Sequence, residues 1–234
     1  MNARFLAIAS DPQLIPGVHH YCDEWCTYCD VTSRCLAFRC TEDWRRQRNR
    51  TADDPPFATR EEAIAFTRQL AEVEGGSTEE LDALIGNAPG ESEIRTNDPL
   101  AGMAWTYATR AAMLLAQIAH DPPYDAVAGD PSPMDVVAWF HLRVYMKLFR
   151  ALVARERTAA GRTDRQEDAI GCAKLALVSI QRSRAALPLL MTPGNAAHVT
   201  RLDALLAALE EGIDGRFPQA RRFVRVGIDV PVAA

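Results

Sequence analysis

The residues most able to bind a metal lie in one short segment near the start of the chain. The sequence HHYCDEWCTYCDVTSRC, residues 19–35, holds two histidines and four of the six cysteines. These cysteines are Cys22, Cys26, Cys29 and Cys35. Clustered thiols can bind a zinc ion, hold an iron–sulfur cluster or form disulfides. The segment is therefore the strongest chemical signal in the sequence.

The spacing of the four cysteines favours an iron–sulfur cluster. They follow the pattern C-x3-C-x2-C-x5-C within fourteen residues. Structural zinc sites usually combine two short cysteine pairs separated by a longer loop, for which this segment has no room. A [4Fe–4S] cluster needs four thiolates from a compact wrap of chain. We therefore expect Cys22, Cys26, Cys29 and Cys35 to bind a [4Fe–4S] cluster with a role in electron transfer, redox sensing or structural support.

A zinc site is the alternative interpretation of the same segment. Cys26, Cys29, Cys35 and Cys40 give C-x2-C-x5-C-x4-C, which is close to a zinc-knuckle spacing. His19 or His20 could also complete a Cys3His site. In this interpretation the chain is a zinc-stapled helical protein-interaction module without catalysis. Free or redox-active thiols are the third interpretation.

Part of the segment resembles a known cluster loop. The stretch WCTYCDVTSRC, with Cys26, Cys29 and Cys35, is similar to the iron–sulfur loop of the endonuclease III-like DNA glycosylases over about ten residues. The C-x2-C-x5-C part matches, whereas the first gap is shorter here than in that family. The resemblance implies a cluster loop and no glycosylase activity, because the sequence lacks that family's helix–hairpin–helix with a catalytic Lys or Asp.

Two further resemblances concern the same cysteines. Cys22, Cys26 and Cys29, with Tyr28 before the last of them, are similar to the radical SAM signature. That resemblance implies a cluster with S-adenosylmethionine on its open iron, but the chain lacks the repeated strand–helix units of that family, so we do not expect this activity. The segment also resembles the opening of a group of bacterial helical proteins with the pattern YCD-x-WC-x-x-C…TSRC. This last resemblance implies no activity.

Length and charge limit the class of protein. The chain has 234 residues and a net charge of −5, which disfavours a nucleic acid partner. The basic run WRRQRNR, residues 44–50, is typical of a solvated linker. No stretch of about 20 apolar residues could span a membrane, and the apolar run at the N-terminus is too short for a signal peptide. We therefore expect a cytoplasmic protein with reduced thiols, an electron-transfer or protein partner, and no membrane contact.

Helical patterns dominate after a break at residues 51–58. Capping residues and apolar periodicity predict helices over 59–73, 77–85, 97–118, 134–158, 164–187 and 195–212, with a further helix within 217–227. Long helices joined by short connections indicate an antiparallel bundle. The predicted fold is therefore mainly α, with a Cys-rich metal-binding segment over residues 1–50 and an antiparallel helical bundle over residues 59–234.

Four polar side chains of the predicted bundle form a candidate active site. His141 and Tyr145 lie one turn apart on the helix 134–158, and Asp168 and Lys174 lie on the otherwise apolar helix 164–187. A buried group of these residues would have shifted pKa values suited to catalysis. The plain alternative is a hydrogen-bonded core histidine and a structural ion pair. We expect Cys172 to be a buried apolar residue and not a ligand.

Overall fold

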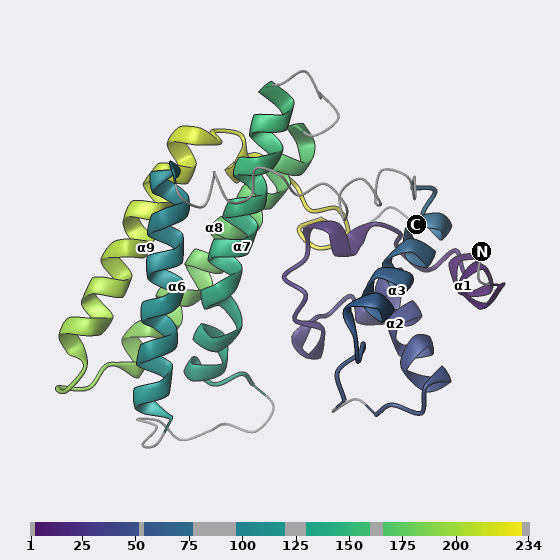
Figure 1. Ribbon diagram of the computed structural model, residues 1–234, viewed down its shortest axis with the longest axis horizontal. Coiled ribbons are helices and arrows are strands. Elements are labelled where there is room, and N and C mark those ends of the chain that lie inside the picture. The colour runs from purple at the N-terminus through teal and green to yellow at the C-terminus, as the bar shows by residue number, and fades with distance from the viewer. Residues whose placement is uncertain (1–2, 52–53, 77–96, 120–129, 160–165, 231–234) are drawn as a thin grey trace. The chain divides into compact units, whose positions relative to one another are not determined.

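The chain is mainly helical, as predicted. The computed structural model describes residues 3–51, 54–76, 97–119, 130–159 and 166–230 (Figure 1). Over these ranges the structure has seven α-helices and several short 3-10 helices, and its only β-structure is two isolated bridges. None of the helices in these ranges combines the length and the hydropathy that a bilayer crossing needs. The predicted helix 77–85 lies outside the described residues.

Contacts divide the described residues into two compact units. The first unit comprises the described residues between 3 and 76 together with 224–230, and the second comprises those between 97 and 223. This division differs from the predicted one, in which residues 1–50 and 59–234 were separate. The difference arises because the helix α3 (Arg60–Val73) packs on the helices before it and contributes Phe66 and Leu70 to their core.

The first unit surrounds an aromatic core. Its elements are α1 (Ala3–Ala9), three 3-10 turns, η1 (Val18–Tyr21), η2 (Cys26–Tyr28) and η3 (Thr32–Arg34), then α2 (Leu36–Gln47) and α3. Phe5 from α1, Trp44 from α2 and Phe66 from α3 meet with tilted or edge-on rings, and their centroids lie 5.6–6.3 Å apart. Each helix therefore supplies one large ring to the same core.

The helix α2 corrects the prediction of a solvated linker over residues 44–50. Trp44 is only 3% exposed and belongs to the core. Its apolar neighbours on the same helix are Leu36, Ala37 and Cys40, which recur at helical spacing and bury one face. Arg45 and Arg46 lie in the last turn of α2, and Arg48 and Arg50 follow its end, so the end of an amphipathic helix explains the composition that resembled a linker.

The helix α3 and the end of the chain complete the first unit. The Thr59 hydroxyl accepts a hydrogen bond from the Glu62 amide, which caps α3 at its predicted start. Gly75, with φ of 77°, ends the helix where expected. Residues 224–230 return to this unit. Gly227 has φ of 85°, and a Cβ added to it would lie 3.1 Å from the Cγ2 of Val18 and 3.2 Å from the Cδ1 of Ile15. Only glycine suits this close approach.

The second unit consists of four long helices around one core. They are α6 (Pro99–Ile118), α7 (Pro133–Ala159), α8 (Gln166–Ala186) and α9 (Ala196–Arg216), with η5 (Leu187–Leu190) and η6 (Ala220–Arg222) beside them. The helix α7 packs along α6 and α8, and α9 packs on the same two helices. The helix α8 is buried on nearly every side, as its all-round apolar pattern predicted.

The ends of these helices follow local sequence signals with two exceptions. Asp98 caps α6 by accepting hydrogen bonds from the amides of Leu100 and Ala101, and Pro99 is its first residue, as predicted. The helix α9 continues past the predicted end at Gly212 to Arg216, because Gly212 is packed inside the helix where Leu100 approaches it. The helix predicted within 217–227 is present only as the short turn η6.

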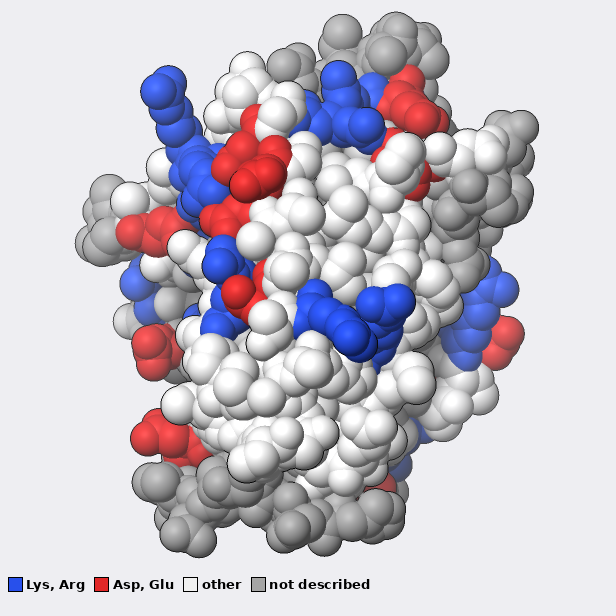
Figure 2. All heavy atoms as spheres, turned by 90° about the vertical axis from the view of Figure 1, so that its left-hand side faces the viewer, with Lys and Arg blue, Asp and Glu red and all other residues white. Residues whose placement is uncertain are grey.

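The outer surface of the second unit carries opposite charges side by side. Figure 2 shows this on the face along which α9 lies, where acidic and basic side chains adjoin and wide areas carry no charge. Arg184 of α8 binds Asp203 and Glu210 of α9 at 2.9 and 2.8 Å. Arg221 binds Glu210 and Asp214 at 2.7 Å. These pairs join α8, α9 and η6 at the surface of the unit.

Candidate metal centre

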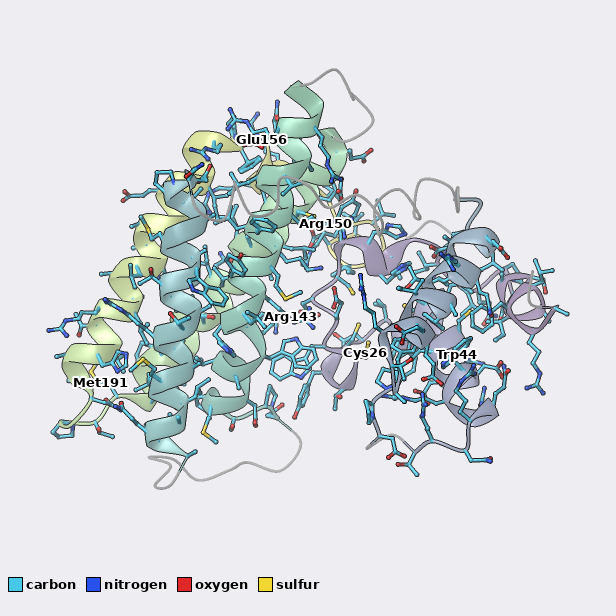
Figure 3. All side chains as sticks on the ribbon, in the orientation of Figure 1. Cys26, Trp44, Arg143, Arg150, Glu156 and Met191 are labelled. Atoms are coloured by element: carbon cyan, nitrogen blue, oxygen red, sulfur yellow. The ribbon has the colours of Figure 1, made fainter. Side chains whose placement is uncertain are left out.

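The four predicted ligand cysteines lie at the ends of successive short turns. Cys22 follows η1, Cys26 begins η2, Cys29 follows η2, and Cys35 lies between η3 and α2. Figure 3 labels Cys26 on this loop. The backbone is extended at the other three cysteines, each of which ends a 3-10 turn. All the cysteines are described, and none forms a disulfide.

Backbone amides donate hydrogen bonds to two of the sulfur atoms. The amide of Glu24 lies 3.3 Å from the Cys22 Sγ, and the amide of Phe38 lies 3.4 Å from the Cys35 Sγ. Cys35 is also the N-cap of α2, where the helix dipole favours a negative charge. Amide hydrogen bonds to sulfur stabilise the thiolate form that binds metals and tune the potential of a bound cluster. These hydrogen bonds offset part of the rise that burial causes in the pKa of the Cys22 and Cys35 thiols.

The thiols of this loop lie within electrostatic range of one another. Burial, followed by the negative charges of Glu24 and Cys26, raises the pKa of the Cys22 thiol to about 12. Burial, followed by the charges of Cys35 and Cys29, raises the pKa of Cys26 to about 11. Thiolates that repel one another in this way are stabilised by a positive ion among them. The donor set of this loop therefore fits a metal ion or cluster.

The cysteine sulfurs of the described chain are not gathered at the spacing of ligands of a single zinc ion. Four thiolates bound to one tetrahedral zinc at about 2.3 Å lie about 3.8 Å from one another. No three cysteine sulfurs of the described chain lie within 4.8 Å of one another. A [4Fe–4S] cluster spreads its ligands more widely, because each thiolate binds a different iron.

The alternative ligands occupy different surroundings. Cys40 is fully buried inside α2, and burial, followed by the charges of Glu74 and Asp43, raises the pKa of its thiol to about 12. His20 lies beside Glu74, whose Oε2 is 3.3 Å from its Nε2. The two alternatives therefore have different partners: Cys40 belongs to the aromatic core, and His20 belongs to a group of nitrogen and oxygen donors.

Glu74 is a residue of the centre that the sequence did not indicate. Its carboxylate lies 3.5 Å from the Nδ1 of His19 and accepts a hydrogen bond of 2.8 Å from the amide of Gly17. Burial raises the pKa of Glu74, but the hydrogen bond with His20 and the charge of His19 together lower this pKa by more than burial raises it. The net pKa of Glu74 is therefore below the usual range. Glu74 is more than fifty residues from His20 in sequence, and only the packing of α3 brings them together.

The four candidate catalytic residues in the second unit have separate partners. The His141 Nδ1 donates to the carbonyl of Ala138 at 2.8 Å in its own helix. Tyr145 is buried, and its ring lies beside the rings of Trp105 and Phe149. These contacts are those of packed helix residues, and within the described part of the chain no hydrogen bond or ion pair links His141 or Tyr145 to the two residues on α8.

The two candidates on α8 are also held by structural contacts. Asp168 binds Arg150 of α7 through two hydrogen bonds of 2.9 and 3.3 Å, and Figure 3 labels Arg150. The Lys174 Nζ donates to the carbonyl of Arg221 at 3.1 Å. Cys172 is buried as predicted, with its Sγ 3.6 Å from the Asp168 carboxylate. The structure therefore does not bring the four candidates into one hydrogen-bonded group.

The arginines of residues 44–50 are paired with acidic residues within the first unit. Arg48 and Arg50 both bind Glu62, at 3.3 and 2.8 Å. Arg45 and Arg46 pair with acidic residues one turn earlier in α2. The guanidinium of Arg48 also lies 3.4 Å from the centre of the Trp44 ring. These arginines are thus engaged by their own unit, and a phosphate backbone would have to compete with four carboxylate contacts.

Comparison with known proteins identifies no relative of this chain. No family model matches it, and neither does a curated protein or a solved structure. The chemistry of the cysteine loop and its surroundings therefore carries the functional proposal.

Proposed function

We propose that this chain is an iron–sulfur protein that binds a [4Fe–4S] cluster through Cys22, Cys26, Cys29 and Cys35. The observation that carries the proposal is the arrangement of these thiols at the ends of consecutive turns, within electrostatic range of one another. The amide hydrogen bonds to two of the sulfurs support it. A bound cluster would supply one-electron chemistry, sensing or structural support.

Four protein thiolates would leave no open iron, so the role of the cluster is electron transfer, redox sensing or stabilisation of the first unit. Cys26 is exposed, and Tyr28 beside it is 43% exposed, so a partner protein can approach this edge of the loop. Asp23 and Glu24 add negative charge near the sulfurs, which disfavours an added electron and lowers the potential. We propose a cytoplasmic location, where thiols stay reduced.

The proposal includes an antiparallel arrangement of the four helices of the second unit. Two ion pairs support it. Arg150 in the second half of α7 binds Asp168 in the first turn of α8. Asp98 before α6 binds Arg216 at the end of α9. Each pair joins the beginning of one helix to the later part of another, as antiparallel neighbours require.

Metal analysis of protein purified without oxygen tests the proposal. We expect a broad visible absorption band and about four irons per chain. Alanine substitution of Cys26 or Cys29 should remove most of the iron. Cys172→Ala is the matched control, because this buried thiol belongs to the other unit, and it should keep the iron.

Two results would overturn the cluster. A colourless protein with one tightly bound zinc would support the zinc-stapled interaction module, and loss of that zinc in Cys40→Ala would identify the fourth ligand. Protein that binds neither metal would leave free or redox-active thiols as the explanation of the segment.

A further inference from the structure

We propose that His19, His20 and Glu74 form a second metal site, without sulfur ligands, for a divalent first-row transition metal such as zinc. The inference goes beyond the cysteine loop and does not depend on it. The Nδ1 of His19, the Nε2 of His20 and a carboxylate oxygen of Glu74 all lie within 4.8 Å of one another. Imidazole and carboxylate are common ligands of zinc and of non-haem iron.

The distances between these donor atoms match ligands of one ion. Ligands of a tetrahedral zinc at about 2.0–2.1 Å lie about 3.3 Å apart. The His20 Nε2 is 3.3 Å from Glu74 Oε2, and the His19 Nδ1 is 3.5 Å from Glu74 Oε1. The same atoms form ion pairs here, and they stand at a spacing that two ligands of one ion also adopt.

The donors are held in place by the surrounding backbone. The two histidines lie in the 3-10 turn η1, which brings their ring centroids to 4.3 Å. The Gly17 amide donates to Glu74 Oε1 at 2.8 Å and fixes the carboxylate, as outer hydrogen bonds do around metal ligands. Gly17 adopts φ of 70°, a conformation that glycine reaches without strain. The site is thus positioned by two segments that are far apart in sequence.

The position of Glu74 calls for a positive charge. Its side chain is only 10% exposed. It is the C-cap of α3, where the helix dipole disfavours a carboxylate. The thiols of Cys35 and Cys40 also lie within its electrostatic range. The two histidines already lower the pKa of this carboxyl group, and a divalent cation bound among the three donors would stabilise the carboxylate further.

Three protein ligands leave one position of a tetrahedral ion open. Sites built from two histidines and one glutamate hold a metal with a water molecule or another small ligand in the remaining position. The fourth position of the proposed site is therefore open to an exchangeable ligand, in contrast to a closed site of four thiolates.

Zinc binding to the full-length protein, as purified, tests this inference. The protein is equilibrated with zinc chloride, and the bound zinc and iron are counted before and after. The zinc X-ray absorption spectrum of the added ion reports its ligands. The variants are His20→Gln, whose side chain is 51% exposed and therefore easily replaced, and Glu74→Gln. His198→Gln, in α9 of the other unit, is the matched control.

We expect one additional zinc per chain with nitrogen and oxygen ligands only. Its dissociation constant should rise at least tenfold in His20→Gln and Glu74→Gln and stay unchanged in His198→Gln. Far-UV circular dichroism confirms that each variant is folded. The inference is overturned if no zinc is added, if the added zinc has sulfur ligands, or if folded His20→Gln binds as tightly as the wild type. Iron content in the same samples reports separately on the cysteine loop.

Discussion

Replacing Trp44 by alanine should unfold the first unit locally and leave the second unit unchanged. Trp44 is 3% exposed, and its ring contacts those of Phe5, Phe57 and Phe66. Removing a buried tryptophan costs about 3–5 kcal/mol of unfolding free energy. The buried indole N–H of Trp44 has no acceptor among the described residues, so removing this unpaired donor offsets a small part of the lost unfolding free energy. We therefore expect a net loss of about 4 kcal/mol for Trp44→Ala and about 1 kcal/mol for Trp44→Phe, which keeps a ring in the core.

Hydrogen exchange read by mass spectrometry separates the two units. A loss of about 4 kcal/mol corresponds to an almost thousandfold increase in the exchange rate of amides that open by unfolding of that unit. Peptides from α2 and α3 should show this increase, and peptides from α8 should not. Trp105→Ala is the control, because this ring is 45% exposed and lies in the second unit. If Trp44→Ala increases the exchange rate of α2 amides less than tenfold, the aromatic core does not stabilise the first unit. Residues 44–50 would then be better described as a solvated linker.

Three further predictions concern caps, glycines and thiols. Asp98→Ala removes the acceptor of two amide hydrogen bonds at the start of α6 and should lower the unfolding free energy by about 1–2 kcal/mol, measured by urea denaturation. Gly102→Ala should raise the unfolding free energy by up to about 1 kcal/mol, because the added Cβ meets no neighbour. Gly212→Ala should lower the unfolding free energy, because the added Cβ would overlap the Cδ1 of the buried Leu100. Melting temperatures of the two variants that shift in the same direction would contradict this. Alkylation of metal-free native protein at pH 8, followed by mass spectrometry, should label the exposed Cys26 before the buried Cys172. Burial raises the pKa of Cys172 to about 12, which leaves about one Cys172 thiol in ten thousand ionised at this pH. Equal labelling rates for the two cysteines would contradict the burial of Cys172.

Local signals explain which helices could be predicted from the sequence. The cap at Asp98-Pro99 and the acidic first turn after Thr59 lie within a few residues of the helices that they start, so both helices were placed correctly. The helix α2 was missed because its N-cap is Cys35, whose type suggested a ligand and not a helix start. The core that buries Trp44 comes from three helices spread along the unit, which no local pattern could reveal.

The candidate metal centre was predictable only in its sequence-local part. The cysteine spacing is visible in one short segment, whereas the placement of each cysteine at the start or end of a turn comes from the structure. The position of Glu74 could not be predicted from the sequence, because it depends on the packing of α3 against η1. The group His141, Tyr145, Asp168 and Lys174 was proposed from shared helices, but helical spacing does not determine which neighbouring helix each side chain meets.

The return of residues 224–230 to the first unit affects the order in which the protein can be completed during synthesis. Ile228 packs against the core formed by residues far upstream, and Gly227 lies against Ile15 and Val18. The second unit is therefore an insertion within the chain of the first, and the ribosome makes all of it before the closing segment emerges. Domains tend to fold as units during synthesis. The core of the first unit, beside the nascent cysteine loop, thus remains incomplete while the four helices of the inserted unit are synthesised and can already fold.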